Sequence, residues 1–278
     1  MRLVTYRSER GNRAGVLTDA GVVDAWDTLG EEGSSVRALL AGGRLAEVEE
    51  GTARAGRTIG NPTLAPPIPD PDKIVCMGLN YRDHADEAGV EPPESPTFFA
   101  KFRNALAAPG ATVPLPEASE KVDFEAEIAF VMGKQARGVD EADALDHVAG
   151  YALLNDLSAR DLQFATPQWI PGKVFDGSAP CGPTLVTPGE AGPHDMLAFA
   201  LDLNGERMQE ASTADLIFSV PALVAHLSRL MTLEPGDLVA TGTPSGVGST
   251  RTPRVWLKAG DEIVITSPQL GTLETTIG

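Results

Sequence analysis

The stretch that decides the fold reads Val122-Asp123-Phe124-Glu125-Ala126-Glu127-Ile128-Ala129-Phe130. Apolar and acidic residues alternate as far as Ile128, which is the period of a β-strand with one buried face. The carboxylates of Asp123, Glu125 and Glu127 therefore share the other face. Like charges at this spacing repel unless a cation lies between them, and a divalent cation with oxygen ligands would be such a partner. The alternative is a solvated face, since most charged residues are exposed.

The composition predicts a soluble globular protein that does not bind nucleic acid. The 278 residues are 42% hydrophobic and 22% charged, enough for one large domain with a small appendage. The formal net charge of −17 repels phosphate backbones. It also repels small anionic substrates, so a site for them needs local cations or a metal.

No membrane segment or disulfide framework is expected. No apolar run reaches the ~18 residues of a membrane helix, and residues 1–6 lack the apolar core of a signal peptide. Two cysteines, Cys76 and Cys181, have no metal-site spacing. Buried free thiols in a reducing cytoplasm are the expectation.

The chain is expected to divide into a small N-terminal α+β unit, residues 1–68, and a larger unit, residues 69–278. In the first unit, short strands are expected over residues 3–6, 13–17 and 22–25, and one helix over residues 35–40. A proline-rich, stiff connector over residues 61–71 marks the boundary.

The larger unit reads as mostly strand, so the fold class is mixed α+β, mainly β. Its strands are expected at 73–78, 122–130, 151–154, 199–203, 206–209, 238–241, 254–257 and 262–265. Asn204-Gly205 between two of them is a strong hairpin signal. Helices are expected over 140–147 and 220–230.

A further acidic residue, Asp156, lies outside this stretch, after an apolar strand and before a helical segment. It could cap that helix. Together with Glu125 and Glu127 it could instead complete a three-carboxylate site, which suits Mg²⁺ or Mn²⁺. Zinc is disfavoured because the pattern brings no His or Cys to these residues.

Two further features could carry chemistry. His84 and Glu87 are three apart, so on a helix the carboxylate could orient the imidazole as a base; the alternative is a solvated histidine. Lys173 could stabilise an oxyanion or enolate, although most lysines lie on the surface. The glycine-rich turn 241–248 lacks the ending of a phosphate-binding loop, but its N–H groups could bind a carboxylate.

Taken together, these segments resemble the fumarylacetoacetate hydrolase family over residues 73–278. The motifs that carry the resemblance are Gly78-Leu79-Asn80-Tyr81 with His84, Phe98-Phe99-Ala100-Lys101, Asp123-Phe124-Glu125-Ala126-Glu127, Asn155-Asp156 with Ser158-Ala159-Arg160-Asp161, Gly172-Lys173 with Pro180, and Thr241-Gly242-Thr243-Pro244. The resemblance implies a β-roll, and usually a homodimer.

The resemblance also assigns roles to residues. It implies that Glu125, Glu127 and Asp156 bind Mg²⁺ or Mn²⁺, that His84 and Glu87 form a catalytic dyad on a lid, and that Lys173 is an active-site lysine. Arg160, Gln163 and Thr243 match substrate-binding positions. Met77 stands where the longer hydrolases of the family place a further metal carboxylate, so the three-carboxylate type fits better.

The expected function is metal-dependent hydrolysis of a C–C bond in an acylpyruvate such as fumarylpyruvate. An oxaloacetate-type decarboxylase and a 2-hydroxyhepta-2,4-diene-1,7-dioate isomerase of aromatic catabolism are the alternatives, because all three pass through an enolate. A non-catalytic, metal-dependent binder of a small molecule is the hypothesis from another class. The presence of His84, Glu87 and Lys173 together argues against it, since a pure binder would not need a base.

Overall fold

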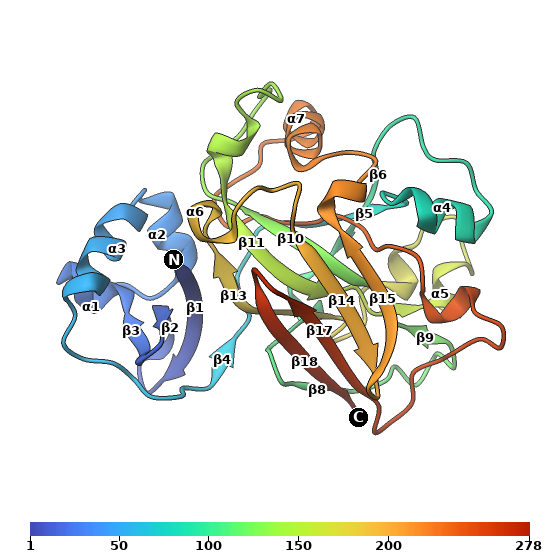
Figure 1. Cartoon of the computed structure of the whole chain (residues 1–278), viewed down its shortest axis with the longest axis horizontal. Coiled ribbons are helices and arrows are strands. Elements are labelled where there is room, and N and C mark those ends of the chain that lie inside the picture. The colour runs from blue at the N-terminus through green and yellow to red at the C-terminus, as the bar shows by residue number, and fades with distance from the viewer.

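The computed structural model describes residues 1–278 and has the predicted mixed, mainly β fold (Figure 1). The strands are β1 Arg2–Ser8, β2 Gly11–Thr18, β3 Gly21–Asp24, β4 Leu64–Ala65, β5 Ile74–Gly78, β6 Thr97–Lys101, β7 Leu106–Ala107, β8 Thr112–Val113, β9 Val122–Asp123, β10 Ala126–Met132, β11 Val148–Asn155, β12 Ser158–Ala159, β13 Ala179–Val186, β14 Ala198–Leu203, β15 Glu206–Ser212, β16 Leu238–Ala240, β17 Glu262–Ser267 and β18 Gly271–Ile277. The α-helices are α1 Ala25–Leu29, α2 Val36–Ala41, α3 Leu45–Arg54, α4 Arg82–Ala88, α5 Arg160–Gln163, α6 Pro188–Ala191 and α7 Val220–Leu230. The 3₁₀ turns are η1 Arg103–Ala105, η2 Ala144–His147, η3 Ile170–Gly172, η4 Thr213–Asp215 and η5 Gly248–Thr250.

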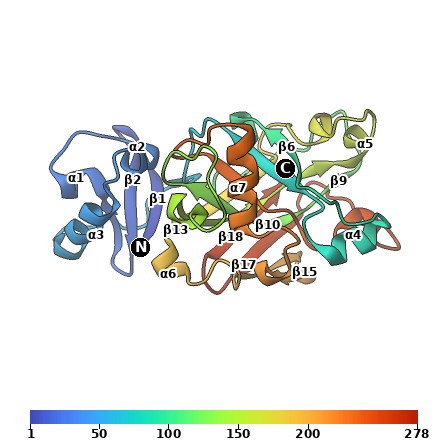
Figure 2. The same ribbon diagram turned by 90° about the horizontal axis from the view of Figure 1, so that it is seen from above.

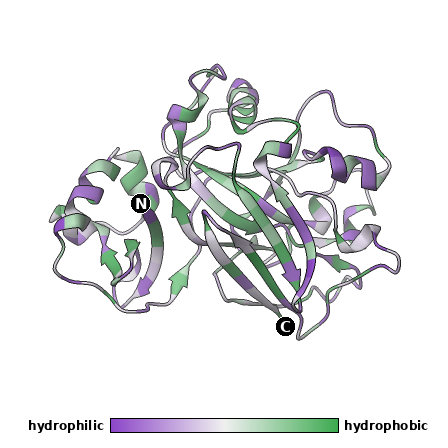
Figure 3. Ribbon diagram, in the orientation of Figure 1, coloured by the Kyte–Doolittle hydropathy of each residue, from purple (hydrophilic) through white to green (hydrophobic).

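Two sheets form the body of the molecule. The larger has the strand order β3-β2-β1-β13-β11-β10-β16-β5-β6, and the smaller has the order β15-β14-β17-β18-β8. Strands β10 and β11 contact β14, β17 and β18 of the smaller sheet. A core of 36 buried residues fills the space between the sheets. The strands of this core form the apolar centre of the molecule (Figure 3).

Both faces of the organising strand are buried, which corrects the prediction of a single buried face and excludes the alternative of a solvated one. Along β10, Ile128 and Phe130 belong to the core between the sheets, whereas Ala129 and Val131 belong to a second core of 24 residues on the opposite face. The acidic side chains of the same stretch are therefore enclosed by protein, and Glu127 is 1% exposed. Because burial of an unpaired charge is costly, these carboxylates need partners.

The N-terminal strands extend the larger sheet. β1 pairs with β13 through Arg2↔Val186 and Leu3↔Leu185, while β2 and β3 continue the sheet away from the core (Figure 1). The view from above places α1–α3 and β1–β3 at one end of the molecule and α4, α5 and β9 at the other (Figure 2). The boundary near residue 68 stays a prediction, since the sheet runs across it.

Several expected elements differ in the structure. The stretch 122–130 is two strands, with a break at Phe124-Glu125. Residues 254–257 are irregular rather than a strand. The helix expected over 140–147 is reduced to the 3₁₀ turn η2. The helix α7 is confirmed at Val220–Leu230, with Ser219 as its N-cap. No helix combines the length and apolarity that crossing a membrane requires.

A buried ion pair stabilises the N-terminal unit. The guanidinium of Arg13 donates to both oxygens of Asp24, with Nη2 2.7 Å from Oδ1, and the Tyr6 hydroxyl donates to Oδ2 at 2.5 Å. Burial alone would raise the pKa of Asp24, but the hydrogen bonds from Arg13 and Tyr6 outweigh it and lower the pKa. The same carboxylate caps α1 through the N–H of Asp27.

We predict that Asp24→Asn lowers the free energy of unfolding at pH 7 by about 3–5 kcal/mol, because it leaves the Arg13 charge buried without its partner. Since the folded-state pKa of Asp24 lies below the unfolded value of about 3.9, the loss is fully present above that pH and shrinks as the pH falls. Urea unfolding at several pH values measures it. Asp27→Asn, at a 57% exposed partner of Arg13, serves as the control and should cost less than about 1 kcal/mol. A pH-independent loss would contradict the assignment.

Candidate metal centre and active-site cavity

Three carboxylates meet at the point where β9 passes into β10. Glu125, Glu127 and Asp156 each offer an oxygen within 4.8 Å of the others, and all three are buried. Strand pairing brings them together, since Glu127 lies opposite Leu154 and the N–H of Asp156 donates to the Glu125 carbonyl at 2.8 Å. Asp156 does not cap α5, whose N-cap residue is Ala159.

Buried cations neutralise part of this charge. The ammonium of Lys173 lies 2.6 Å from Glu125 Oε2 and 2.9 Å from Asp156 Oδ2. Lys101 donates to the other Asp156 oxygen at 2.7 Å. Burial alone would raise the pKa of Glu125, but Arg160 and Lys173 lower the pKa to about 2. Lys173 is therefore not the surface lysine that its residue type suggests.

Glu127 has no such cation in contact. Its Oε2 accepts a hydrogen bond from the N–H of Gly242 at 2.8 Å. Gly242 has a φ of 96°, a left-handed conformation that favours glycine, and this turn directs the N–H toward the carboxylate. Burial, followed by repulsion from Asp156 and Glu125, raises the pKa of Glu127 well above its usual range.

The three carboxylates fit a divalent cation. They are oxygen donors only, with no His or Cys among them, which is the ligand set of Mg²⁺ and Mn²⁺. A cation among them would also remove the repulsion that raises the pKa of Glu127. Lys173 would then share two of the carboxylates with the ion.

The predicted dyad is present on α4. His84 Nδ1 lies 3.4 Å from Glu87 Oε2, and the His84 side chain is 13% exposed rather than solvated. Glu87 also accepts from the N–H of Gly246 at 3.0 Å, and Asp83 accepts from the hydroxyl of Ser245 at 2.6 Å. Two carboxylates thus hold α4 against the glycine-rich turn that follows β16.

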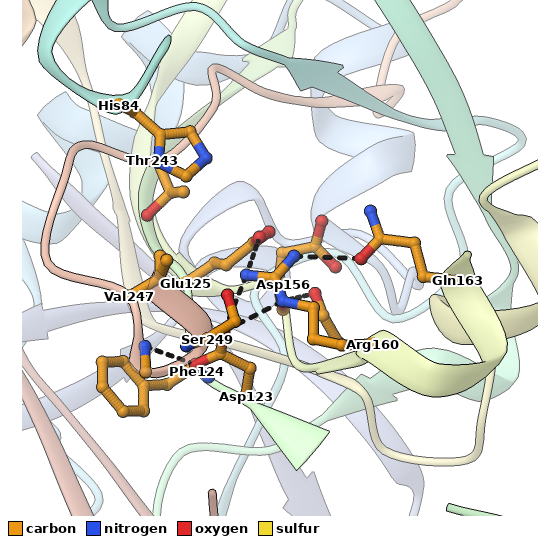
Figure 4. A network of polar contacts seen from close by, with 12 residues as sticks. His84, Asp123, Phe124, Glu125, Asp156, Arg160, Gln163, Thr243, Val247 and Ser249 are labelled. Carbon is orange, nitrogen blue, oxygen red and sulfur yellow. Dashed lines mark hydrogen bonds and ion pairs between the residues drawn. The ribbon is translucent and has the colours of Figure 1, made fainter. Parts of the chain in front are cut away.

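Arg160 connects the triad to the neighbouring loop (Figure 4). Its Nε donates to Asp123 Oδ2 at 2.9 Å, its Nη1 donates to Gln163 Oε1 at 3.0 Å, and its Nη2 lies 2.7 Å from Glu125 Oε1. Asp123 in turn accepts from the N–H groups of Gly248 and Ser249 at 2.7 and 3.0 Å. One buried carboxylate therefore fixes both the arginine and the loop.

These residues border a cavity of about 590 Å³. Of the predicted site residues, the cavity is lined by His84, Glu125, Glu127, Arg160, Gln163, Lys173 and Thr243. Asp156 and Glu87 lie behind this lining, each in contact with a residue that belongs to it. The Thr243 hydroxyl donates to the Ala126 carbonyl at 2.9 Å, so it can only accept a hydrogen bond from a substrate.

Several residues that shape the site have no role predicted from the sequence. Lys101 is fully buried and holds Asp156, although a lysine at the end of a strand gives no sign of burial. Gln209 links Thr243 to the N–H of Ala126 across the break between β9 and β10. Trp169 packs edge-on against Phe99. A Cβ added at Gly78 would lie only 2.4 Å from the ring of Trp169.

Comparison with known proteins shows which family the chain resembles. Residues 73–278 match the family described as Fumarylacetoacetate (FAA) hydrolase C-terminal. Oxaloacetate tautomerase YisK of Bacillus subtilis (strain 168) is 45% identical over 219 residues, which cover 77% of this chain and 73% of that protein. The mitochondrial oxaloacetate tautomerase fahd2 of Xenopus laevis is 42% identical over 219 residues, covering 78% and 69%. The solved structure of maleylpyruvate hydrolase from Sphingobium sp. SYK-6 has a TM-score of 0.83 and 30% identity, covering 100% of this chain and 99% of that one.

The chain belongs to the fumarylacetoacetate hydrolase family. The relatives are named as enzymes, yet their names divide between tautomerase and hydrolase, so the family defines the catalytic scaffold and not the reaction. The cytoplasmic location expected for this chain stays a prediction, because the name of the Xenopus laevis relative refers to mitochondria.

We predict that Glu127→Gln abolishes tight Mg²⁺ and Mn²⁺ binding. The amide keeps the size of the side chain and can still accept from Gly242, but it loses the charge that a divalent ion needs. Affinity measured by calorimetry should fall by more than the roughly 10- to 100-fold that changes outside the ligand shell cost. Glu206→Gln, at an exposed hairpin position, is the matched control. Unchanged ion affinity in Glu127→Gln would refute the carboxylate site.

Proposed function

We propose that this protein is a divalent-metal-dependent enzyme that enolises 2-oxo dicarboxylic acids, with keto–enol tautomerisation of oxaloacetate as its first activity. One observation carries the proposal: the imidazole of His84 and the carboxylates of Glu125 and Glu127 line the same cavity. The names of the relatives at 42% and 45% identity support oxaloacetate as the substrate.

A bound divalent ion would supply Lewis acidity toward the 2-oxo acid, which makes the adjacent carbon more acidic. Arg160 and Lys173 lie beside the same carboxylates and add positive charge for the acid group of the substrate. Gln163 uses its oxygen on Arg160, so its side-chain N–H₂ stays free to donate to a bound oxygen.

The dyad is suited to remove a proton from the carbon next to the 2-oxo group. Burial alone would raise the pKa of Glu87, but hydrogen bonds from His84, Thr250 and Gly246 lower it, so the carboxylate is ionised at neutral pH. An ionised carboxylate only accepts, and Nδ1 of His84 therefore carries the proton that it shares with Glu87. The Nε2 atom is then free to take the substrate proton and to return it to the 2-oxo oxygen, which completes the tautomerisation.

Hydrolysis of an acylpyruvate is the second candidate. The same Nε2 could remove a proton from water for attack on a distal carbonyl, and the cavity of about 590 Å³ leaves room for an acyl group. The name of the Sphingobium relative supports this reaction. Decarboxylation and isomerisation share the enolate, and exclusion of water would favour them.

We predict that His84→Ala lowers the Mg²⁺-dependent rate of oxaloacetate tautomerisation by about 10²- to 10⁴-fold, the usual contribution of a general base. The ultraviolet absorbance of the enol follows the reaction. Mg²⁺ affinity should be unchanged, since His84 is not part of the carboxylate triad. His194→Ala is the control, because His194 does not line the cavity. A fully active His84→Ala variant would exclude His84 as the base, and a wild type that tautomerises nothing but cleaves fumarylpyruvate would favour hydrolysis.

A further inference from the structure

Two cations at the rim of the cavity have no role in the chemistry described so far. Lys121 and Arg254 both line the cavity, and both are exposed. Neither forms an ion pair, whereas Arg160 and Lys173, deeper in the cavity, are each held by buried carboxylates. In a chain with a net charge of −17, two unpaired cations at the entrance of one cavity create a local region that attracts anions.

The backbone places the two cations on neighbouring segments. The N–H of Leu257 donates to the Val122 carbonyl at 2.8 Å, which sets Lys121 beside the segment that contains Arg254. The N–H of Val255 donates to the Gly248 carbonyl at 3.0 Å and closes the loop that joins Gly248 to Val255. Asp123 anchors this loop through Gly248 and also holds Arg160 (Figure 4), so the rim is fixed relative to the carboxylate triad.

Apolar side chains also line the cavity near its exposed edge. Phe164 is 68% exposed and Val90 is 43% exposed, and Trp256 belongs to the same segment as Arg254. Besides Glu125 and Glu127, one further carboxylate lines the cavity, that of Asp161. Its oxygens accept hydrogen bonds from the hydroxyl of Ser119 and the N–H of Glu120. Asp161 is thus held by its own partners and does not pair with Lys121.

We propose that Lys121 and Arg254 form a subsite for a second carboxylate, carried at the far end of an apolar chain. This inference rests on the proposed function, because the first carboxylate and the 2-oxo group would bind at the triad. The subsite would favour 2-oxo dioates longer than oxaloacetate, whose four carbons fill only part of a cavity of this size. It selects for length and terminal charge, whereas a divalent ion held by the triad would bind the 2-oxo acid.

Binding to the Mg²⁺-loaded protein tests the subsite with three probes. Oxalate occupies the metal alone, and 2-oxoadipate and 2-oxohexanoate have the same chain length but differ in the terminal carboxylate. Calorimetry should show that the wild type binds 2-oxoadipate roughly fivefold or more tightly than 2-oxohexanoate, in the range of one or two exposed ion pairs. The preference should weaken as the salt concentration rises from about 0.05 to about 0.5 M.

The double variant Lys121→Gln, Arg254→Gln should lose this preference and keep its affinity for oxalate. Lys134→Gln, Arg7→Gln is the control, since it removes the same charge at exposed positions outside the cavity and should keep the preference. A wild type that does not prefer 2-oxoadipate to 2-oxohexanoate, or a double variant that keeps this preference, would overturn the subsite. In either case, binding of oxalate would leave the proposed function standing. Failure of oxalate to bind the Mg²⁺-loaded wild type would instead contradict the proposed function, and the subsite with it.

Discussion

The structure depends on a cluster of opposite charges sealed inside a β fold. Four buried carboxylates face three buried cations; they are Asp123, Glu125, Glu127 and Asp156, with Lys101, Arg160 and Lys173. Removing any one charge from such a cluster leaves a partner uncompensated in a poorly solvated interior. Glu127 is the one carboxylate of the four that no cation contacts, and a divalent ion among the carboxylates would supply the missing positive charge. The side chains of the cluster are buried, which strengthens the electrostatic interactions among them.

The fold positions chemistry by bringing distant segments to this cluster. Strand pairing sets Asp156 against Glu125, the turn after β16 directs an N–H toward Glu127, and α4 holds His84 above the cavity. The glycine-rich turn contributes twice, because the hydroxyl of Ser245 and the N–H of Gly246 also donate to Asp83 and Glu87 of α4. The candidate metal ligands, the proposed base and the rim thus share one framework, and Asp123 links Arg160 to the loop.

Much of this could be predicted from the sequence, and the failures have physical causes. The alternation through Ile128 identified the carboxylates, but it could not show that β11 and β16, which lie far apart in the chain, enclose the strand on both sides. Residues 254–257 have strand-forming side chains, yet the N–H of Val255 bonds to Gly248 in a 3₁₀ turn. The single bond from the N–H of Leu257 to Val122 of β9 does not extend into a ladder. The burial of Lys101 could not be predicted because its partner, Asp156, is 55 residues away in the chain. Local pattern shows residue type and period, whereas burial and pairing come from the tertiary structure.

The central claim is that Glu125, Glu127 and Asp156 together bind one divalent ion. A crystal structure of the protein soaked with Mn²⁺, with anomalous scattering recorded at the manganese edge, tests it most directly. The account predicts a single strong peak among the three carboxylates, with Lys173 and Arg160 still in contact with Glu125. A peak elsewhere, or carboxylates that stay closed around Lys173 with no metal between them at saturating Mn²⁺, would contradict it.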